Sequence, residues 1–83
     1  MTDTDTLDAT FRLALGLADD IDLGETAYGQ TEGWDSVGHM ELILGIEAAF
    51  GISIEADDVF AMSDFRAARA VLRERYSLDL QEP

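Results

Sequence analysis

The clearest helix signals in this 83-residue chain lie in DSVGHMELILGIEAAFG, the stretch from Asp35 to Gly51. It opens with Asp35 and Ser36, and either side chain can accept a hydrogen bond from a first-turn amide as the N-cap of a helix. It closes with Gly51, a common helix stop because glycine adopts the left-handed backbone conformation without steric cost. The stretch therefore predicts a helix that runs to Phe50.

The apolar residues of this predicted helix fall on two faces. The first face is an inward stripe at helical spacing, formed by Leu42, Ile43, Ile46 and Phe50. The second face mixes apolar side chains with carboxylates, namely Val37, Met40, Glu41, Leu44 and Glu47. Since one stripe suffices for packing, the mixed face is expected to meet partner proteins. Gly45 costs roughly 1 kcal/mol relative to alanine in mid-helix, which indicates either close packing or room for another group.

Upstream of this stretch, the sequence predicts one more helix and a long loop. The helix begins after Thr6, where apolar residues recur every three or four positions: Leu7, Phe11, Ala14, Leu15 and Ala18. The next segment, residues 19–35, mixes acids with glycines and holds only scattered apolar side chains, Ile21, Leu23, Tyr28 and Trp34. Because these side chains need something to pack on, we expect an ordered loop rather than a linker.

Downstream, Ile52 and Ile54 are expected as buried connectors to a short acidic helix over residues 56–61. Ser63 or Asp64 is expected to cap a last helix, whose inward positions are Phe65, Ala68, Val71, Leu72 and Tyr76. Four arginines occupy the remainder of that helix, Arg66, Arg69, Arg73 and Arg75. The sequence thus predicts an all-α fold, a small four-helix bundle of three main helices and a short third one.

Length and charge limit the possible functions. A domain of this size buries only about 60–65% of the surface that its unfolded chain exposes, so a deep substrate cleft is not expected, and neither is an enzyme. Eighteen acidic residues against five arginines give a net charge of −13, which repels phosphate backbones and anionic lipid headgroups. The expected partners are basic protein surfaces, without nucleic acid or membrane.

The whole chain, residues 1–83, is expected to form one domain with an ordered core of about 5–76 and short, frayed tails. Its acidic start lacks the positive charge of a secretory signal, and Glu41 and Glu47 interrupt the longest apolar stretch. We therefore expect a soluble, cytoplasmic monomer. With no cysteine, the chain forms no disulfide and offers no thiolate to zinc or to catalysis.

A calcium-binding loop is one alternative site, because Asp20, Asp22 and Gly24 occupy alternate positions of an acidic segment. The spacing does not fit: the fifth loop position, Gly24, lacks a side-chain oxygen, and the twelfth, Thr31, is not a bidentate glutamate. No metal site is therefore expected.

A hydrolase triad is a second alternative, in which Ser36 and His39 would act with a nearby aspartate. The two residues share one helical turn, and the small chain has no independent element to build an oxyanion hole. We therefore expect His39 to be a solvated surface histidine. From its position alone, Ser36 is favoured as an N-cap.

The residues around Ser36 together resemble the signature of acyl carrier proteins. In that family Asp-Ser-Leu opens helix two, a Glu-Leu step follows, and the helix ends in Glu-x-x-Phe-Gly-Ile-x-Ile. The matching residues here are Asp35, Ser36, Val37, Glu41, Leu42, Glu47, Phe50, Gly51, Ile52 and Ile54. The resemblance extends over essentially the whole chain, in length, helix order, long first loop and acidity.

The resemblance implies that Ser36, with Asp35 as its motif neighbour, carries a phosphopantetheine arm that a separate phosphopantetheinyl transferase transfers from coenzyme A. Acyl groups would be attached to the thiol of this arm as thioesters, and the chain itself would be a non-catalytic carrier. By resemblance, acyl-loading, acyltransferase and synthase enzymes carry basic patches that bind to the mixed face. Asp57 and Asp58, on the short third helix, are expected to extend the negative rim of that face. Leu42, Ile46, Phe50, Val59, Phe60 and Met62 are expected to line the bundle in which a carrier can hold its cargo.

Departures from the family pattern bear on the pathway. Val37 replaces the usual leucine, and Ala48 and Ala49 stand where carriers of primary fatty acid synthesis often have glutamates. The sequence GWDSVGHMELIL looks closer to discrete carriers of polyketide and other specialised pathways. The alternatives are a carrier of primary fatty acid synthesis, a stand-alone aminoacyl carrier and, in a different class, an acidic helical adaptor in which Ser36 only caps a helix.

Overall fold

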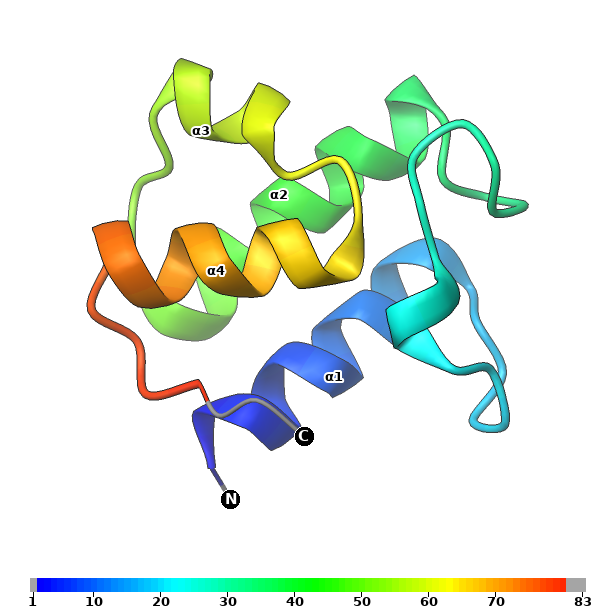
Figure 1. The fold of residues 1–83 in the computed structure, drawn as a ribbon, viewed down its shortest axis with the longest axis horizontal. Helices are drawn as coiled ribbons and strands as arrows, with labels where there is room; N and C mark the ends of the chain where they lie inside the picture. The colour runs from blue at the N-terminus through cyan, green and yellow to red at the C-terminus, as the bar shows by residue number, and fades with distance from the viewer. Residues whose placement is uncertain (1, 81–83) are drawn as a thin grey trace.

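A computed structural model describes residues 2–80 of the chain. The elements follow in the order α1 (Asp3–Leu15), the single-turn 3-10 helix η1 (Leu23–Glu25), α2 (Ser36–Phe50), α3 (Ala56–Ala61) and α4 (Phe65–Arg75). In Figure 1, α4 lies in front of α2, with α1 below it and the short α3 above it. The expected all-α fold, with three main helices and a short third one, is confirmed.

Local capping decides where α2 and α4 begin and end. The Asp35 carboxylate accepts a hydrogen bond from the Gly38 N–H at 2.9 Å, so Asp35 is the N-cap and Ser36 is the first helical residue. Gly51 ends α2 with a φ of 66°, in the left-handed conformation that glycine adopts freely. For α4, Asp64 rather than Ser63 is the N-cap, since its carboxylate accepts from the Ala67 N–H at 2.7 Å.

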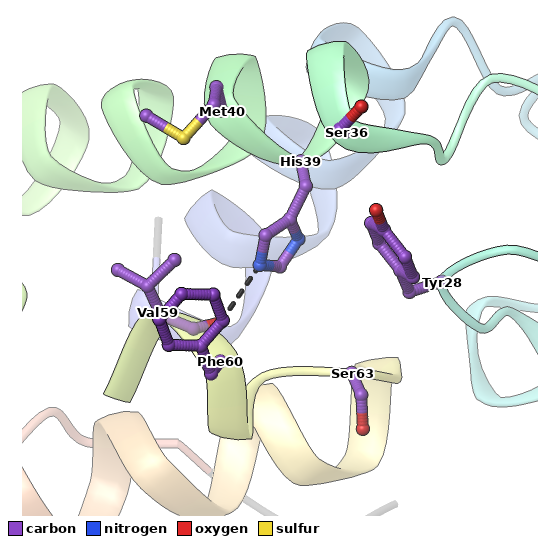
Figure 2. A pocket seen from close by; sticks show the side chains of 7 residues that line it. All are labelled: Tyr28, Ser36, His39, Met40, Val59, Phe60 and Ser63. Carbon is purple, nitrogen blue, oxygen red and sulfur yellow. Dashed lines mark hydrogen bonds between the residues drawn. The ribbon is translucent and has the colours of Figure 1, made fainter. Parts of the chain in front are cut away.

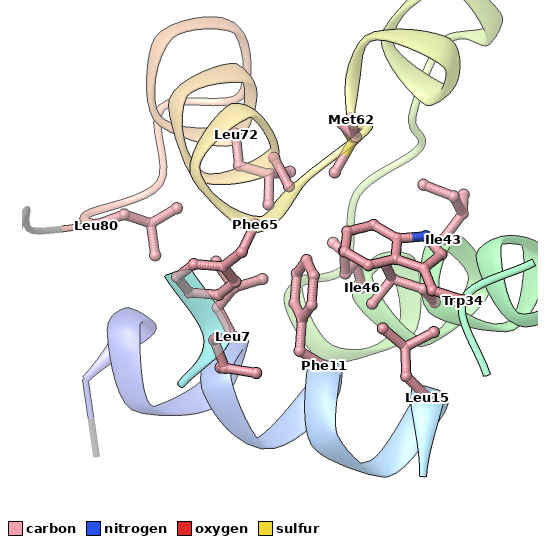
Figure 3. Close-up of a cluster of buried hydrophobic side chains, with 13 residues drawn as sticks. Leu7, Phe11, Leu15, Trp34, Ile43, Ile46, Met62, Phe65, Leu72 and Leu80 are labelled. Carbon is pink, nitrogen blue, oxygen red and sulfur yellow. The ribbon is translucent and has the colours of Figure 1, made fainter. Parts of the chain in front are cut away.

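The core gathers side chains from all the long helices and from the loop (Figure 3). At its centre, the fully buried ring of Phe11 meets Trp34 and Phe65 edge-on, with ring centroids 5.6 and 4.8 Å away. The remaining buried apolar residues are Leu7, Leu15, Leu23, Leu42, Ile43, Ile46, Met62, Ala68, Leu72 and Leu80. The inward stripe predicted for α2 is thus confirmed at three positions, while Phe50 is only half-buried.

Regular structure and packing reach further toward both ends of the described chain than the spacing of apolar residues predicts. Helix α1 already begins at Asp3, because the Thr2 hydroxyl caps it by accepting from the Asp5 N–H at 3.1 Å. The tail returns to the core, where Leu80 is buried, and the Asp79 N–H donates to the Asp3 carboxylate at 3.0 Å. The prediction of a frayed tail is therefore wrong for residues 77–80, and residues 81–83 lie outside the described residues.

The long loop is ordered, but fewer apolar anchors hold it than expected. Leu23 and Trp34 are buried, whereas Ile21 and Tyr28 are 40% and 43% exposed. The guanidinium of Arg12 anchors this part of the loop in place of the Ile21 side chain. It donates hydrogen bonds to the backbone carbonyls of Ala18 and Ile21 at 2.7 and 2.9 Å. Charge-assisted hydrogen bonds to the backbone thus fix the first half of the loop. The spacing of apolar residues does not predict such bonds.

Between residues 2 and 80, none of the helices has the length and apolar character needed to cross a membrane.

Two glycines of α2 lie against neighbouring segments. Gly38 is buried, and a Cβ atom added there would collide with the backbone carbonyl oxygen of Gly33, at the end of the loop. Gly45 approaches α1, where an added Cβ atom would lie 3.3 Å from the methyl group of Thr10. Helix α1 therefore packs closely on α2 at Gly45, against a side-chain methyl group rather than against backbone.

The two glycines should respond differently to substitution by alanine. Gly38→Ala pushes the first turn of α2 away from the backbone at Gly33, so it should lower the free energy of unfolding by about 1–3 kcal/mol. Gly45→Ala meets only a movable methyl group and gains helix propensity, so its effect should stay below about 1 kcal/mol. Urea unfolding of both variants measures this difference, and equal effects would contradict the close contact of Gly38 with Gly33.

Candidate functional site

Ser36 presents its hydroxyl at the start of α2. Because Asp35 caps the helix, the hydroxyl is not needed for capping, and within residues 2–80 it makes no hydrogen bond. The side chain is exposed, and it lies beside the amide groups that form the positive end of the helix dipole. The interpretation of Ser36 as an N-cap is therefore wrong, since its neighbour provides the cap.

A pocket of about 320 Å³ opens beside Ser36, between the first turns of α2, α3 and the loop (Figure 2). Its walls are mainly aromatic and apolar, and they comprise Tyr28, Ser36, His39, Met40, Val59, Phe60 and Ser63. Tyr28 and Ser63 come together because the Tyr28 N–H donates to the Ser63 carbonyl at 2.8 Å, next to an isolated antiparallel bridge between Ala27 and Asp64. Pairing between such distant segments has no signature in the local sequence pattern.

His39 is not the solvated surface histidine expected from the sequence. Its Nδ1 atom lies 2.9 Å from the indole Nε1 of Trp34, and its Nε2 atom lies 2.8 Å from the backbone carbonyl oxygen of Val59. The ring stacks near the Trp34 indole at 6.1 Å and meets the Tyr28 ring edge-on at 5.4 Å. His39 is thus a bonded bridge between α2, the loop and α3.

These two bonds determine the form of the His39 ring. An indole N–H can only donate and a carbonyl oxygen can only accept, so Nδ1 must carry a lone pair and Nε2 must carry the proton. The ring is therefore neutral and in a single tautomer. Since its only acceptor nitrogen is occupied by Trp34, His39 is not free to act as a base toward Ser36.

The apolar part of the mixed face of α2 is exposed, as the spacing predicts. Val37, Met40 and Leu44 are 68%, 53% and 59% exposed, and Glu41 beside them is exposed as well. On α3, Asp57 is also exposed. We call Val37, Met40, Glu41 and Leu44 the α2 face.

Phe60 was expected to line the interior of the bundle, but it is 82% exposed and borders the pocket with Met40. A helix of six residues carries too little periodicity to show which of its side chains point inward. Of the other expected lining residues, Leu42, Ile46 and Met62 are fully buried in the core, while Phe50 and Val59 pack partly against it.

Two carboxylates assigned to docking have partners within the molecule. Glu47 is half-buried, and its Oε2 atom accepts a hydrogen bond from the Ile54 N–H at 2.8 Å, which holds the connector to α3. Asp58 is buried between α3 and the end of α4, where Arg75 Nε lies 2.6 Å from Oδ1 and the Tyr76 hydroxyl donates to Oδ2 at 2.5 Å. The expected docking role is therefore wrong for the buried Asp58, whereas only one carboxylate oxygen of Glu47 is engaged.

The Asp58 cluster also changes the protonation of its members. The hydrogen bond from Tyr76, followed by the one from Arg75, lowers the pKa of the Asp58 carboxyl below its ordinary value. Partial burial, together with the hydrogen bond to Asp58, raises the pKa of Tyr76. The same hydroxyl accepts from the Glu55 N–H at 2.9 Å, so Tyr76 also fixes the first residues of α3.

Other binding chemistries find little support among the described residues. Across residues 2–80, no group of three or more His, Cys, Asp and Glu side chains gathers as it would around a metal ion. Comparisons with protein-family models, with curated proteins and with solved structures found no match to this chain. Its functional assignment therefore depends on the residues themselves.

Asp58→Asn should destabilise the protein in a pH-dependent manner. Because the folded-state pKa of Asp58 is lowered, its ionised form stabilises the fold fully above the ordinary value of 3.8. That contribution is lost as the pH falls through the lower, folded-state pKa. The variant should therefore unfold at lower urea than the wild type at about pH 7, and the gap should narrow at acid pH.

Asp57→Asn is the matched control, because it neutralises the neighbouring exposed carboxylate. It should unfold at nearly the same urea concentration as the wild type throughout the pH series. A gap for Asp58→Asn that stays constant with pH would contradict an ionic role for Asp58.

Proposed function

We propose that this chain is an acyl carrier protein, whose phosphopantetheine arm is attached to Ser36. The observation that best supports the proposal is the division of roles at the start of α2. Asp35 caps the helix, and the next residue presents a hydroxyl that the fold does not use. An adaptor in which Ser36 merely caps the helix does not account for this arrangement.

The surroundings of Ser36 fit a phosphodiester and a flexible arm. A phosphate on the first residue of α2 lies at the positive end of the helix dipole, which favours an anion by roughly 0.3–1 kcal/mol at an exposed site. The pocket beside Ser36 has apolar walls and about 320 Å³ of space. Once attached, the arm supplies the thiol that this cysteine-free chain lacks, and acyl groups are carried on it as thioesters.

Attachment requires a partner enzyme. In the transfer, the Ser36 hydroxyl oxygen forms a new bond to the pantetheine-linked phosphorus of coenzyme A, the pyrophosphate bond breaks, and adenosine 3′,5′-bisphosphate leaves. The hydroxyl proton needs a base, and His39 cannot supply one because its lone pair accepts the Trp34 N–H. We therefore assign the base, and the metal that accompanies coenzyme A, to the phosphopantetheinyl transferase.

The α2 face is the proposed docking surface for that transferase and for acyl-loading, acyltransferase and synthase enzymes. It combines exposed apolar side chains with the carboxylate of Glu41, so a basic rim on the partner would be attracted to it. Ala48 and Ala49 are exposed, and Glu47 is engaged internally, so few carboxylates remain on α2. A sparsely acidic helix supports a carrier of polyketide or other specialised synthesis over one of primary fatty acid synthesis.

The attachment is tested by the intact mass of the purified chain after incubation with coenzyme A, magnesium and a broad-specificity phosphopantetheinyl transferase. Wild type should gain one phosphopantetheine, and Ser36→Ala should gain none. Since the Ser36 hydroxyl makes no internal bond, Ser36→Ala should keep its stability within about 0.5 kcal/mol.

Ser63→Ala is the matched control for this experiment, because it removes another serine that lines the same pocket. This variant should be modified like the wild type. An unmodified wild-type chain that is shown to be folded would refute the carrier proposal and favour the acidic adaptor.

Docking on the α2 face should depend on Glu41. Reversing its charge by Glu41→Lys should raise the KM of the transferase by roughly threefold to tenfold at low salt. The effect should shrink at high salt, because exposed charges are then screened. Glu74→Lys places the same charge change on α4 and should leave the KM nearly unchanged, whereas equal effects of both variants would point to overall charge rather than to this face.

A further inference from the structure

Tyr28 belongs to the long loop, yet its side chain lines the pocket beside Ser36. The ring does not pack in the core as a loop anchor would, and it is 43% exposed. Figure 2 shows the Tyr28 hydroxyl at the end of the ring that points toward Ser36. Within residues 2–80 this hydroxyl makes no hydrogen bond. The pocket therefore holds a hydrogen-bond donor that the fold does not use.

The backbone on both sides of this ring is fixed. The Tyr28 N–H donates to the Ser63 carbonyl at 2.8 Å, and the Gly29 N–H donates to the carbonyl of the buried Trp34 at 2.9 Å. The ring itself meets the His39 imidazole edge-on, with centroids 5.4 Å apart. Because the phenol is already in place, a group that binds its hydroxyl loses little conformational freedom in the loop.

We propose that the Tyr28 hydroxyl donates a hydrogen bond to the phosphate on Ser36, and so holds the start of the arm on the pocket side of α2. This inference rests on the proposed carrier function, and it makes Tyr28 a positioning residue that takes no part in attachment. A phosphodiester is an anion that only accepts hydrogen bonds, and bonds to an anion are stronger than those between neutral groups. Without the Tyr28 hydroxyl, the arm would stay attached but would point freely into solvent.

The other polar groups of the pocket do not offer this bond. His39 already uses both of its ring nitrogens within the molecule. The Ser63 hydroxyl points away from Ser36 in Figure 2. No lysine or arginine belongs to the residues that line the pocket. In a chain of net charge −13, the neutral phenol of Tyr28 is thus the side-chain donor that the pocket provides for a phosphate.

The test is a thermodynamic cycle on wild type and Tyr28→Phe, each without and with the arm, whose complete attachment is checked by intact mass. Phenylalanine keeps the ring and its edge contact with His39, and it removes only the hydroxyl. Without the arm, the two chains should unfold at nearly the same urea concentration, because the hydroxyl has no internal bond. Attachment should lower the unfolding equilibrium constant of wild type by roughly threefold to tenfold more than that of Tyr28→Phe.

A purely structural role of Tyr28 would shift the forms with and without the arm equally. An arm that changes the unfolding constants of the two chains by the same factor would therefore overturn the inference.

A second readout is ³¹P NMR of the two arm-bearing chains, in which the arm carries one phosphorus. The wild-type resonance should differ from that of the same protein unfolded in urea, because the phosphate accepts a bond in the folded state. In folded Tyr28→Phe the resonance should move toward the unfolded position. Identical resonances in the two folded chains would also contradict the bond.

Ser63→Ala is the matched control, since it removes the other hydroxyl of the pocket wall. It should keep both the wild-type effect of the arm on stability and the wild-type ³¹P resonance. Equal losses in Ser63→Ala and Tyr28→Phe would overturn a specific role of Tyr28. A folded wild-type chain that takes no arm would refute the carrier function together with this inference, whereas an arm that ignores Tyr28→Phe would refute the inference alone.

Discussion

The burial of Trp34 is the constraint on which the arrangement around Ser36 depends. Its indole is 1% exposed and packs edge-on against Phe11, the central ring of the core, so the end of the long loop is held on α1. The next residue, Asp35, is thereby placed where its carboxylate caps α2, and the indole N–H points at His39. One buried side chain thus connects the core, the start of α2 and the pocket wall.

The features that the sequence predicted are those that neighbouring residues determine. The bounds of α2 follow from Asp35 and Gly51, which act on backbone groups within four positions of themselves. The short α3 and the exposure of the α2 face also agree with the spacing of apolar residues. The position of Ser36 at an exposed helix start was therefore predictable, although the choice of cap between two adjacent side chains was not.

The missed features join segments that lie far apart in the chain. The bond of His39 to Val59 spans twenty positions, and the clamp on Asp58 comes from the end of another helix. Arg69 belongs to the polar side of α4 by its spacing, yet it is 4% exposed, and its guanidinium lies 5.5 Å from the centre of the Phe65 ring. The spacing of apolar residues predicts which side chains face the core. It does not predict which polar groups form hydrogen bonds or ion pairs once the helices have packed.

The contact between Asp79 and Asp3 brings the last described residues of the chain to the beginning of α1. Helix α1 runs for thirteen residues, about 20 Å, from that end of the molecule toward the loop that leads to Ser36. A label or dye attached at Asp3 or at Asp79 would therefore report from the same end of the molecule, whichever of the two residues carries it. That end lies across the length of α1 from the loop before Ser36, so a pair of labels, one there and one near Ser36, spans the longest helical rod leading to the site.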